Sequence, residues 1–174
     1  PLEGLVMATR AGDVDPGLLI YLLRNGHELD EIEDKLLHHS GLIGVAKSNS
    51  DMRDLLARQE TDENAKLAIE MFCYRARKYL GAYMAILNGA DCIIFGGGIG
   101  ENAAQVRQKI CNDMSWCGLQ LDEERNQLAH NLSSGANLRI SADSSKIVVY
   151  VMAVNEALAI AEDAKALVLS NNYS

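Results

Sequence analysis

The residues best suited to chemistry lie in the stretch IIFGGGIGEN, residues 93–102. Apolar residues run into three glycines, an isoleucine, a fourth glycine and Glu-Asn. Glycine lets a backbone approach a ligand closely, and the free N–H groups at a helix start favour anions. A strand, a glycine-rich turn and a helix start together indicate a phosphate or nucleotide site. The alternative is a turn that lets the next helix pack closely on the sheet. The motif is neither a Walker A loop nor the dinucleotide fingerprint.

A second junction of the same kind occurs in VYVMAVNEALAIA. Asn155 and Glu156 stand there between a predicted strand and a predicted helix. Because open α/β sheets bind ligands at the carboxyl ends of their strands, Glu156 is expected on the same edge as the glycine turn. Its carboxylate is suited to hold Mg²⁺ directly or through water. The alternative role is that of an acid favoured by the helix macrodipole.

Two charged segments in the first half are further candidates. Arg10, in MATRAGDVDP, is either an anion clamp that stabilises charge on a transferring phosphoryl group or a surface residue. Asp51 and Arg53, in SDMRD, either pair locally or contact a nucleotide. The four histidines are scattered on polar positions and support no Ser-His-Asp arrangement.

The elements that must position these residues are mostly helical in the first half. Asp15-Pro16 opens a helix that ends at Asn25-Gly26, and its near-continuous apolar character predicts burial. A second helix is expected over 29–38, a loop or short turn over 41–50, and a helical stretch from Asp51. The longest helix, over 62–88, carries an apolar stripe at helical spacing: Ala68, Phe72, Ala76, Tyr79, Tyr83 and Leu87.

The second half alternates strands and helices. DCIIF, residues 91–95, predicts a fully buried strand, and Asn102 is expected to cap a helix that runs to about Trp116. A strand-like piece and a short helix follow over 119–130, then the strand candidates NLRIS and KIVVYVM. The final helix begins after Asn155, with Leu158, Ala161 and residues 164–166 facing inward. This order predicts an α/β fold with a mainly parallel sheet.

Composition limits the class of protein. The 174 residues suffice for one domain with a core, and the net charge of −8 argues against a non-specific grip on nucleic acid. No apolar run approaches the roughly 20 residues of a membrane span, and the first ten residues lack a signal-peptide layout. The four cysteines show no zinc spacing; Cys73 and Cys92 are expected in the core, in a reduced, cytoplasmic setting.

Several stretches together resemble the acetate kinase family, in the same order and at similar spacing. They are PLEGLVMATRAGDVDP, SGLIGV, SNSDMRD, YLGAYMAILNGADCIIFGGGIGEN, QLDEERN and VNEALAIA. The resemblance covers nearly the whole chain. It implies a ribonuclease-H-like (actin-like ATPase) domain, and transfer of the γ-phosphoryl group of ATP to acetate, reversibly, with Mg²⁺. The product pair would be acetyl phosphate and ADP.

The resemblance also implies roles for individual residues. Arg10 would be the active-site arginine near the transferring phosphoryl group, and Glu156 the magnesium-associated carboxylate. Two segments would line the nucleotide: Asp51, Met52 and Arg53 at the adenosine, and Gly97, Gly98, Ile99, Gly100 and Asn102 in the loop beside the adenine, ribose and phosphates. The family usually has a threonine where Gly96 stands, an aromatic at Met52 and Pro-Thr at Ala153-Val154, which bears on nucleotide affinity.

The family comparison also sets expectations about domains and partners. Residues 1–174 would be the C-terminal portion of the second domain, without the N-terminal domain and the first strands of the second. The fragment alone is then expected to be inactive, since half of the phosphate-binding groups would be missing. A homodimer through this domain is expected. The alternatives are a dimerisation module without catalysis and a fragment of a propionate or butyrate kinase. A truncated sheet would leave an exposed edge that invites pairing.

Overall fold

The computed structural model describes residues 2–171, without the side chains at positions 156, 157, 159 and 169–171. The chain forms two compact units. The first unit runs to Gly89 and also contains Gln108–Asn112. The second contains Ala90–Arg107 and the chain from Asp113 onward.

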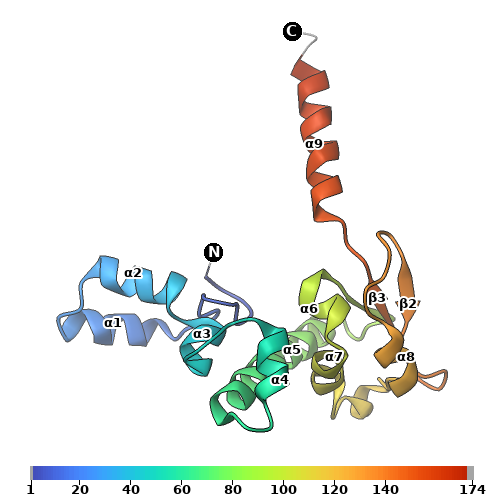
Figure 1. Ribbon diagram of the computed structural model, residues 1–174, viewed down its shortest axis with the longest axis horizontal. Helices are drawn as coiled ribbons and strands as arrows, with labels where there is room; N and C mark the ends of the chain where they lie inside the picture. The colour runs from blue at the N-terminus through green and yellow to red at the C-terminus, as the bar shows by residue number, and fades with distance from the viewer. Residues whose placement is uncertain (1, 172–174) are drawn as a thin grey trace. The chain divides into compact units, whose positions relative to one another are not determined.

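The first unit is helical, as expected from its sequence. Its helices are α1 (Pro16–Arg24), α2 (Leu29–His38), α3 (Gly41–Ala46), α4 (Met52–Arg58) and α5 (Glu63–Ile86). Figure 1 shows α1 and α2 as an antiparallel pair. Aspartates fix three helix starts by accepting backbone N–H groups: Asp15 caps α1, Asp51 caps α4 and Asp62 caps α5. These local signals are the ones that the sequence predicted.

The core of the first unit lies where α3 and α4 pack on α5. Cys73 is buried there, as predicted. The predicted stripe on α5 is only partly correct, since Ala68 is buried but Tyr83 and Leu87 are exposed. The buried residues of α5 are Ala65, Ala68, Ile69, Cys73 and Met84.

Two predictions for the first unit are wrong. Residues 41–46 form helix α3 rather than a loop, although two glycines lie in it. No residue of α1 is buried, and four of its large apolar side chains are about half exposed or more: Leu18, Ile20, Tyr21 and Leu23. Apolar character alone therefore did not specify burial, because no described element covers these side chains.

The second unit is built on a three-stranded sheet in the order β1-β3-β2. Strand β1 (Cys92–Phe95) runs parallel to β3 (Val148–Met152), and β2 (Asn137–Arg139) runs antiparallel to β3. The α/β class is confirmed, with a short mixed sheet. Its helices are α6 (Gly97–Asn102), α7 (Ala104–Cys111), which continues into the first unit, α8 (Glu123–Leu128), α9 (Glu156–Asn171) and the 3₁₀ turn η1 (Ser115–Cys117).

The core of the second unit surrounds the central strand β3, whose Val149 and Val151 are fully buried. Strand β1 is buried on one face only, which corrects the prediction of a fully buried strand. Ile94 and Cys92 are exposed, so the prediction that Cys92 is a core residue is wrong. The alternation shows that no described element covers the face that carries Cys92 and Ile94. Strand β1 also lies at the edge of the sheet: among the described residues, β3 is its one strand partner.

Two helix predictions in the second unit are also corrected. The helix after β1 begins at Gly97, inside the glycine run, so Asn102 ends α6 instead of capping a helix. The final helix does follow Asn155, but the side chains expected to face inward are exposed: Leu158, Ala161 and residues 164–166. Across the described residues, no helix combines the length and the apolar character needed to cross a membrane.

Candidate nucleotide site

The two strand-to-helix junctions lie on one edge of the sheet. Strands β1 and β3 are parallel neighbours in which Phe95 is paired with Val151. The glycine turn leaves the end of β1, and Val154 and Asn155 follow the end of β3. The prediction that both junctions share one edge is therefore confirmed, and this is the edge where open α/β sheets bind ligands.

Glu101 joins the two junctions directly. Its Oε1 accepts the backbone N–H of Gly97, at 3.0 Å, and the backbone N–H of Val154, also at 3.0 Å. One carboxylate oxygen thus ties the start of α6 to the segment that enters α9. Glu101 is part of the GGGIGEN stretch that the sequence analysis singled out. Nothing in the spacing of the residues there indicates that it bonds to the distant Val154.

The glycines of this edge have different local tasks. Gly97 has φ +71°, a conformation that favours glycine, and it forms the turn into α6. An added Cβ on Gly98 would meet nothing within 4 Å, whereas one on Gly100 would lie 3.4 Å from the backbone of Phe95. Since 3.4 Å is an ordinary van der Waals distance, close packing does not require glycine at either position, and the space beside Gly98 is open among the described residues. The interpretation of this turn as a nucleotide site stays a prediction.

A buried arginine holds the far end of α6. Arg107 is fully buried and donates from Nη1 to the backbone carbonyls of Gly100 and Glu101, at 2.9 and 3.0 Å. Its Nε donates to Asn126 Oδ1, and its Nη2 donates to the carbonyls of Asn126 and Ala129. All five N–H donors of the guanidinium are used. The sequence did not single out this residue.

The side chain of Asn102 also serves structure. Its Nδ2 donates to the carbonyl of Gly98 at 3.1 Å, and its Oδ1 accepts the backbone N–H of Asn131 at 3.0 Å. Asn102 therefore attaches the end of α6 to the chain after α8. This network compensates for the poor helix propensity of the glycines in α6.

The second junction begins helix α9. Asn155 Oδ1 accepts the backbone N–H of Leu158, at 2.9 Å, so Asn155 caps the helix. Glu156 is the first helical residue, and its side chain lies outside the described part of the structure. Among the side chains that are described, no three His, Cys, Asp or Glu residues form a metal-binding group. A single carboxylate suits Mg²⁺, which keeps several waters and binds substrate phosphates.

Arg10 lies on an exposed loop of the first unit. The loop is fixed by α3, whose first N–H groups donate to loop carbonyls: Ser40 to Thr9, Leu42 to Met7 and Ile43 to Ala8. These bonds replace a side-chain cap, which α3 lacks. The Arg10 guanidinium has no hydrogen bond or ion pair to any described residue, so it is available to an external anion.

A second set of contacts anchors the same loop to α5. Asp13 accepts hydrogen bonds from the Gly4 N–H, at 2.7 Å, and from the Tyr79 hydroxyl, and it pairs with Arg75 at 2.9 Å. The Gly4 bond and then the Tyr79 bond lower the pKa of Asp13, and the bond to Asp13 raises the pKa of Tyr79. The sequence interpretation missed this group, because 62 and 66 residues separate Asp13 from its partners on α5.

The Asp51–Arg53 segment pairs locally. Asp51 caps α4 by accepting the Arg53 N–H, at 2.9 Å, and its Oδ2 accepts Arg53 Nη2 at 2.7 Å. The hydrogen bonds from Arg53 lower the pKa of Asp51 to about 2. Met52 is buried beneath them, while the Arg53 side chain is 87% exposed.

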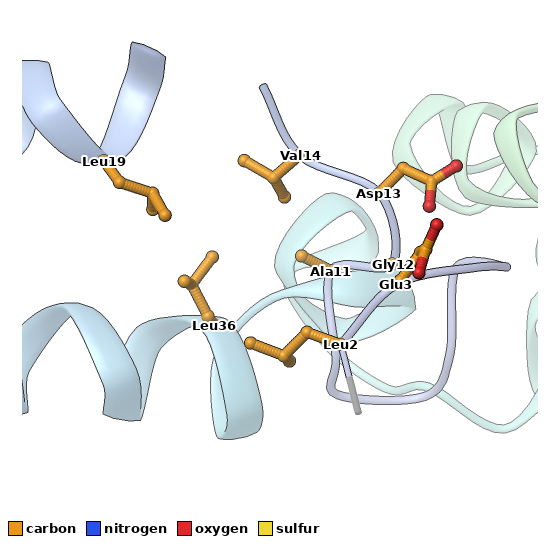
Figure 2. A pocket seen from close by; sticks show the side chains of 8 residues that line it. All are labelled: Leu2, Glu3, Ala11, Gly12, Asp13, Val14, Leu19 and Leu36. Atoms are coloured by element: carbon orange, nitrogen blue, oxygen red, sulfur yellow. The ribbon is translucent and has the colours of Figure 1, made fainter. Parts of the chain in front are cut away.

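A pocket of about 430 Å³ lies beside the Arg10 loop. Figure 2 shows its apolar side chains from α1, α2 and the loop on one side, and the carboxylates of Glu3 and Asp13 on the other. Because its lining contains no basic side chain, it is unsuited to a phosphate. The lining residues are Leu2, Glu3, Ala11, Gly12, Asp13, Val14, Leu19 and Leu36.

Comparison with known proteins defines the class. The chain belongs to the acetokinase family, whose model matches residues 1–162. It is 51% identical to the acetate kinase of Chloroherpeton thalassium over 166 residues, which cover 94% of this chain and 39% of that protein. It is 48% identical to the acetate kinase of Campylobacter concisus, covering 92% and 40%. The chain thus spans about two fifths of the curated relatives it matches.

Solved structures agree with this family and fold. Acetate kinase from Porphyromonas gingivalis has a TM-score of 0.86 and 38% identity, over 97% of this chain and 42% of that one. A propionate kinase from Francisella tularensis has a TM-score of 0.79 and the same 38% identity, over 91% and 39%. The predicted family resemblance is confirmed.

Proposed function

We propose that this chain is the C-terminal portion of the second domain of an acetate kinase and forms the nucleotide-binding half of its site. The whole enzyme would transfer the γ-phosphoryl group of ATP to acetate. A carboxylate oxygen of acetate would bond to the γ-phosphorus while the bond to the bridging oxygen of ADP breaks. The reaction would run in both directions. The observation that carries this proposal is the shared edge formed by two parallel strand ends in a chain of this family.

This edge of the sheet is better suited to the nucleoside part of a nucleotide than to its phosphates. The N–H of Gly97 is already occupied by Glu101, so it is not free to bind a phosphate oxygen. The negative carboxylate beside it also disfavours a phosphate there. We therefore assign Gly97, Gly98, Ile99, Gly100 and Asn102 mainly to the adenine and ribose, with Gly98 leaving room for close approach. Asp51 and Arg53 would flank the adenosine, and buried Met52 would support α4 beneath them.

The phosphates would be held by cations. Arg10, whose exposed side chain has no partner among the described residues, is the candidate for stabilising charge on the transferring phosphoryl group. Mg²⁺, held through Glu156, would neutralise charge on the phosphates of ATP or ADP. The isolated chain is expected to bind nucleotide without turnover. Phosphoryl transfer depends on several positioned cationic groups, and this chain spans about two fifths of the relatives named acetate kinase.

Acetate is the favoured acyl substrate because the relatives reported above at 48–51% identity are named acetate kinase. Propionate or butyrate is the second candidate, since identity to the solved propionate kinase equals identity to a solved acetate kinase. The whole protein is further proposed to be a cytoplasmic homodimer joined through this domain. In support, all four cysteines are free thiols and α5 exposes large apolar side chains near its end.

Calorimetric titration with Mg-ADP tests the nucleotide site on this chain. Wild-type chain is expected to bind, and Glu156→Ala to bind about tenfold more weakly because a charged contact is lost. Glu162→Ala, an exposed position on the same helix, is the matched control and should bind like wild type. Absence of binding by the wild-type chain, or equal affinities in all three proteins, would contradict the proposal.

A further inference from the structure

Glu101 connects two segments that are distant in the sequence through one carboxylate oxygen. A single oxygen accepts two backbone N–H groups from segments 57 residues apart in the chain, Gly97 and Val154, each at 3.0 Å. One N–H belongs to the first residue of α6, which has no partner within its own helix. The other belongs to the segment that leads from β3 into α9.

We propose that Glu101 is the positioning residue of the nucleotide site, holding the glycine turn and the β3–α9 junction at a fixed separation. This inference rests on the proposed function. The adenine and ribose would lie against the glycine turn, while Glu156 starts the helix after Val154. A ligand that spans both junctions binds tightly only if their separation is fixed in advance, because otherwise binding must order them.

The local sequence explains why this role requires a side chain. Helix α6 has glycine at three of its six positions, and glycine is a poorer helix former than alanine. The would-be Cβ positions of Gly97 and Gly98 meet no neighbouring atom within 4 Å, so packing does not hold the turn at these residues. The carboxylate of Glu101 therefore holds the backbone of the turn in place, which the glycines alone do not do.

The geometry specifies the length of the side chain and an acceptor oxygen at its end. Glutamine can place a carbonyl oxygen at the same point and accept both N–H groups, without the charge. Aspartate is one methylene shorter and cannot keep both bonds from the same backbone position. The opposite end of α6 is anchored separately by Arg107 and Asn102, so loss of Glu101 should release the turn without unfolding the unit.

Two measurements on the full 174-residue chain test the proposal. Amide exchange by NMR should show the Gly97 and Val154 protons protected in wild type. Both should exchange faster by about tenfold or more in Glu101→Ala and Glu101→Asp, and by less in Glu101→Gln. The dissociation constant for Mg-ADP should rise about tenfold in the first two variants and stay within about threefold in Glu101→Gln. Glu124→Ala, at an exposed position of α8, is the control and should match wild type in both.

The outcomes separate this inference from the proposed function. If Glu101→Ala leaves either amide protected, Glu101 does not hold the junctions and the inference is overturned. If both amides are released but Mg-ADP affinity is unchanged, the connection does not serve the ligand and the inference is again overturned. If the wild-type chain binds no Mg-ADP, the proposed function fails, while the exchange data still decide whether Glu101 joins the two segments.

Discussion

Arg107 and Asn126 are both fully buried and meet through two hydrogen bonds. Arg107 Nε donates to Asn126 Oδ1 at 2.8 Å, and Nη2 donates to the Asn126 backbone carbonyl at 2.6 Å. Asn126 Nδ2 in turn donates to the carbonyl of Ala104, at 3.0 Å. The pair links α6, α7 and α8 around the fully buried guanidinium of Arg107. Loss of the pair should therefore lower the free energy of unfolding.

Replacement of Arg107 by methionine tests that network. The variant leaves the carbonyls of α6 and α8 without their donor, and we expect the second unit to lose about 3 kcal/mol or more of its free energy of unfolding. Lysine should rescue little, because it lacks the planar fork of five donors. Hydrogen exchange of β3 amides reports the change. Lys165→Met, on the exposed surface of α9, should have almost no effect; a similar loss there would contradict the account.

Two glycine-to-alanine changes should have opposite effects on the free energy of unfolding. Gly41 has φ +64°, and an added Cβ would lie 2.3 Å from the Met7 carbonyl oxygen and 2.6 Å from that of Arg10. Gly41→Ala should therefore destabilise the first unit by about 3 kcal/mol or more and disturb the Arg10 loop. Gly81→Ala, in α5 with open space, should stabilise by roughly 0.5–1 kcal/mol. Urea unfolding measures both, and equal effects would contradict the close approach of α3 to the loop.

The Asp13 contacts predict a pH dependence. The folded-state pKa of Asp13 is lowered, so its stabilising contribution is complete above its unfolded pKa of about 3.8 and is lost as pH falls through the folded value. Wild type should thus exceed Asp13→Asn in stability at pH 5–6, and the difference should shrink below about pH 4. Unfolding of both proteins across this range checks the sign. Glu33→Gln, at an exposed position of α2, is the control; a difference that grows in acid would contradict the assignment.

The dimer proposal has its own test at the end of α5. Ile86 and Leu87 are 78% and 70% exposed, and Tyr83 beside them is 56% exposed. If this surface contacts a second copy, Ile86→Glu should shift the chain from dimer to monomer, because burying a charge without a partner is unfavourable. Sedimentation equilibrium measures the shift, with Lys66→Glu at an exposed polar position of α5 as the control. A wild-type monomer would contradict the proposal.

Local signals allowed the sequence to predict much of the helical framework. Asp15, Asp51 and Asp62 precede the helices that they cap, and the side-chain-to-backbone bonds involved span only two or three residues. The strand before the glycines and the family were likewise recognisable from contiguous residues. Such features depend on short-range chemistry that a pattern of residue types can express.

The wrong predictions concern helices whose structure or burial depends on residues that are distant in the sequence. Helix α3 looks like a loop because two of its six residues are glycine, yet its start is satisfied by carbonyls more than thirty residues earlier. Helix α6 likewise depends on Glu101 and Arg107 reaching across the fold. Burial of α1 was predicted from its apolar residues, but burial depends on a covering surface. These are tertiary effects that override local propensity.

The most direct test of the central claim is an NMR titration of the labelled chain with Mg-ADP, following every amide. We expect the largest shifts at residues 96–102 and 154–156, with further shifts at 51–53, and none of comparable size around the pocket formed by Leu2, Val14, Leu19 and Leu36. Shifts concentrated at that pocket, with the glycine turn unchanged, would show that this edge of the sheet is not the nucleotide site.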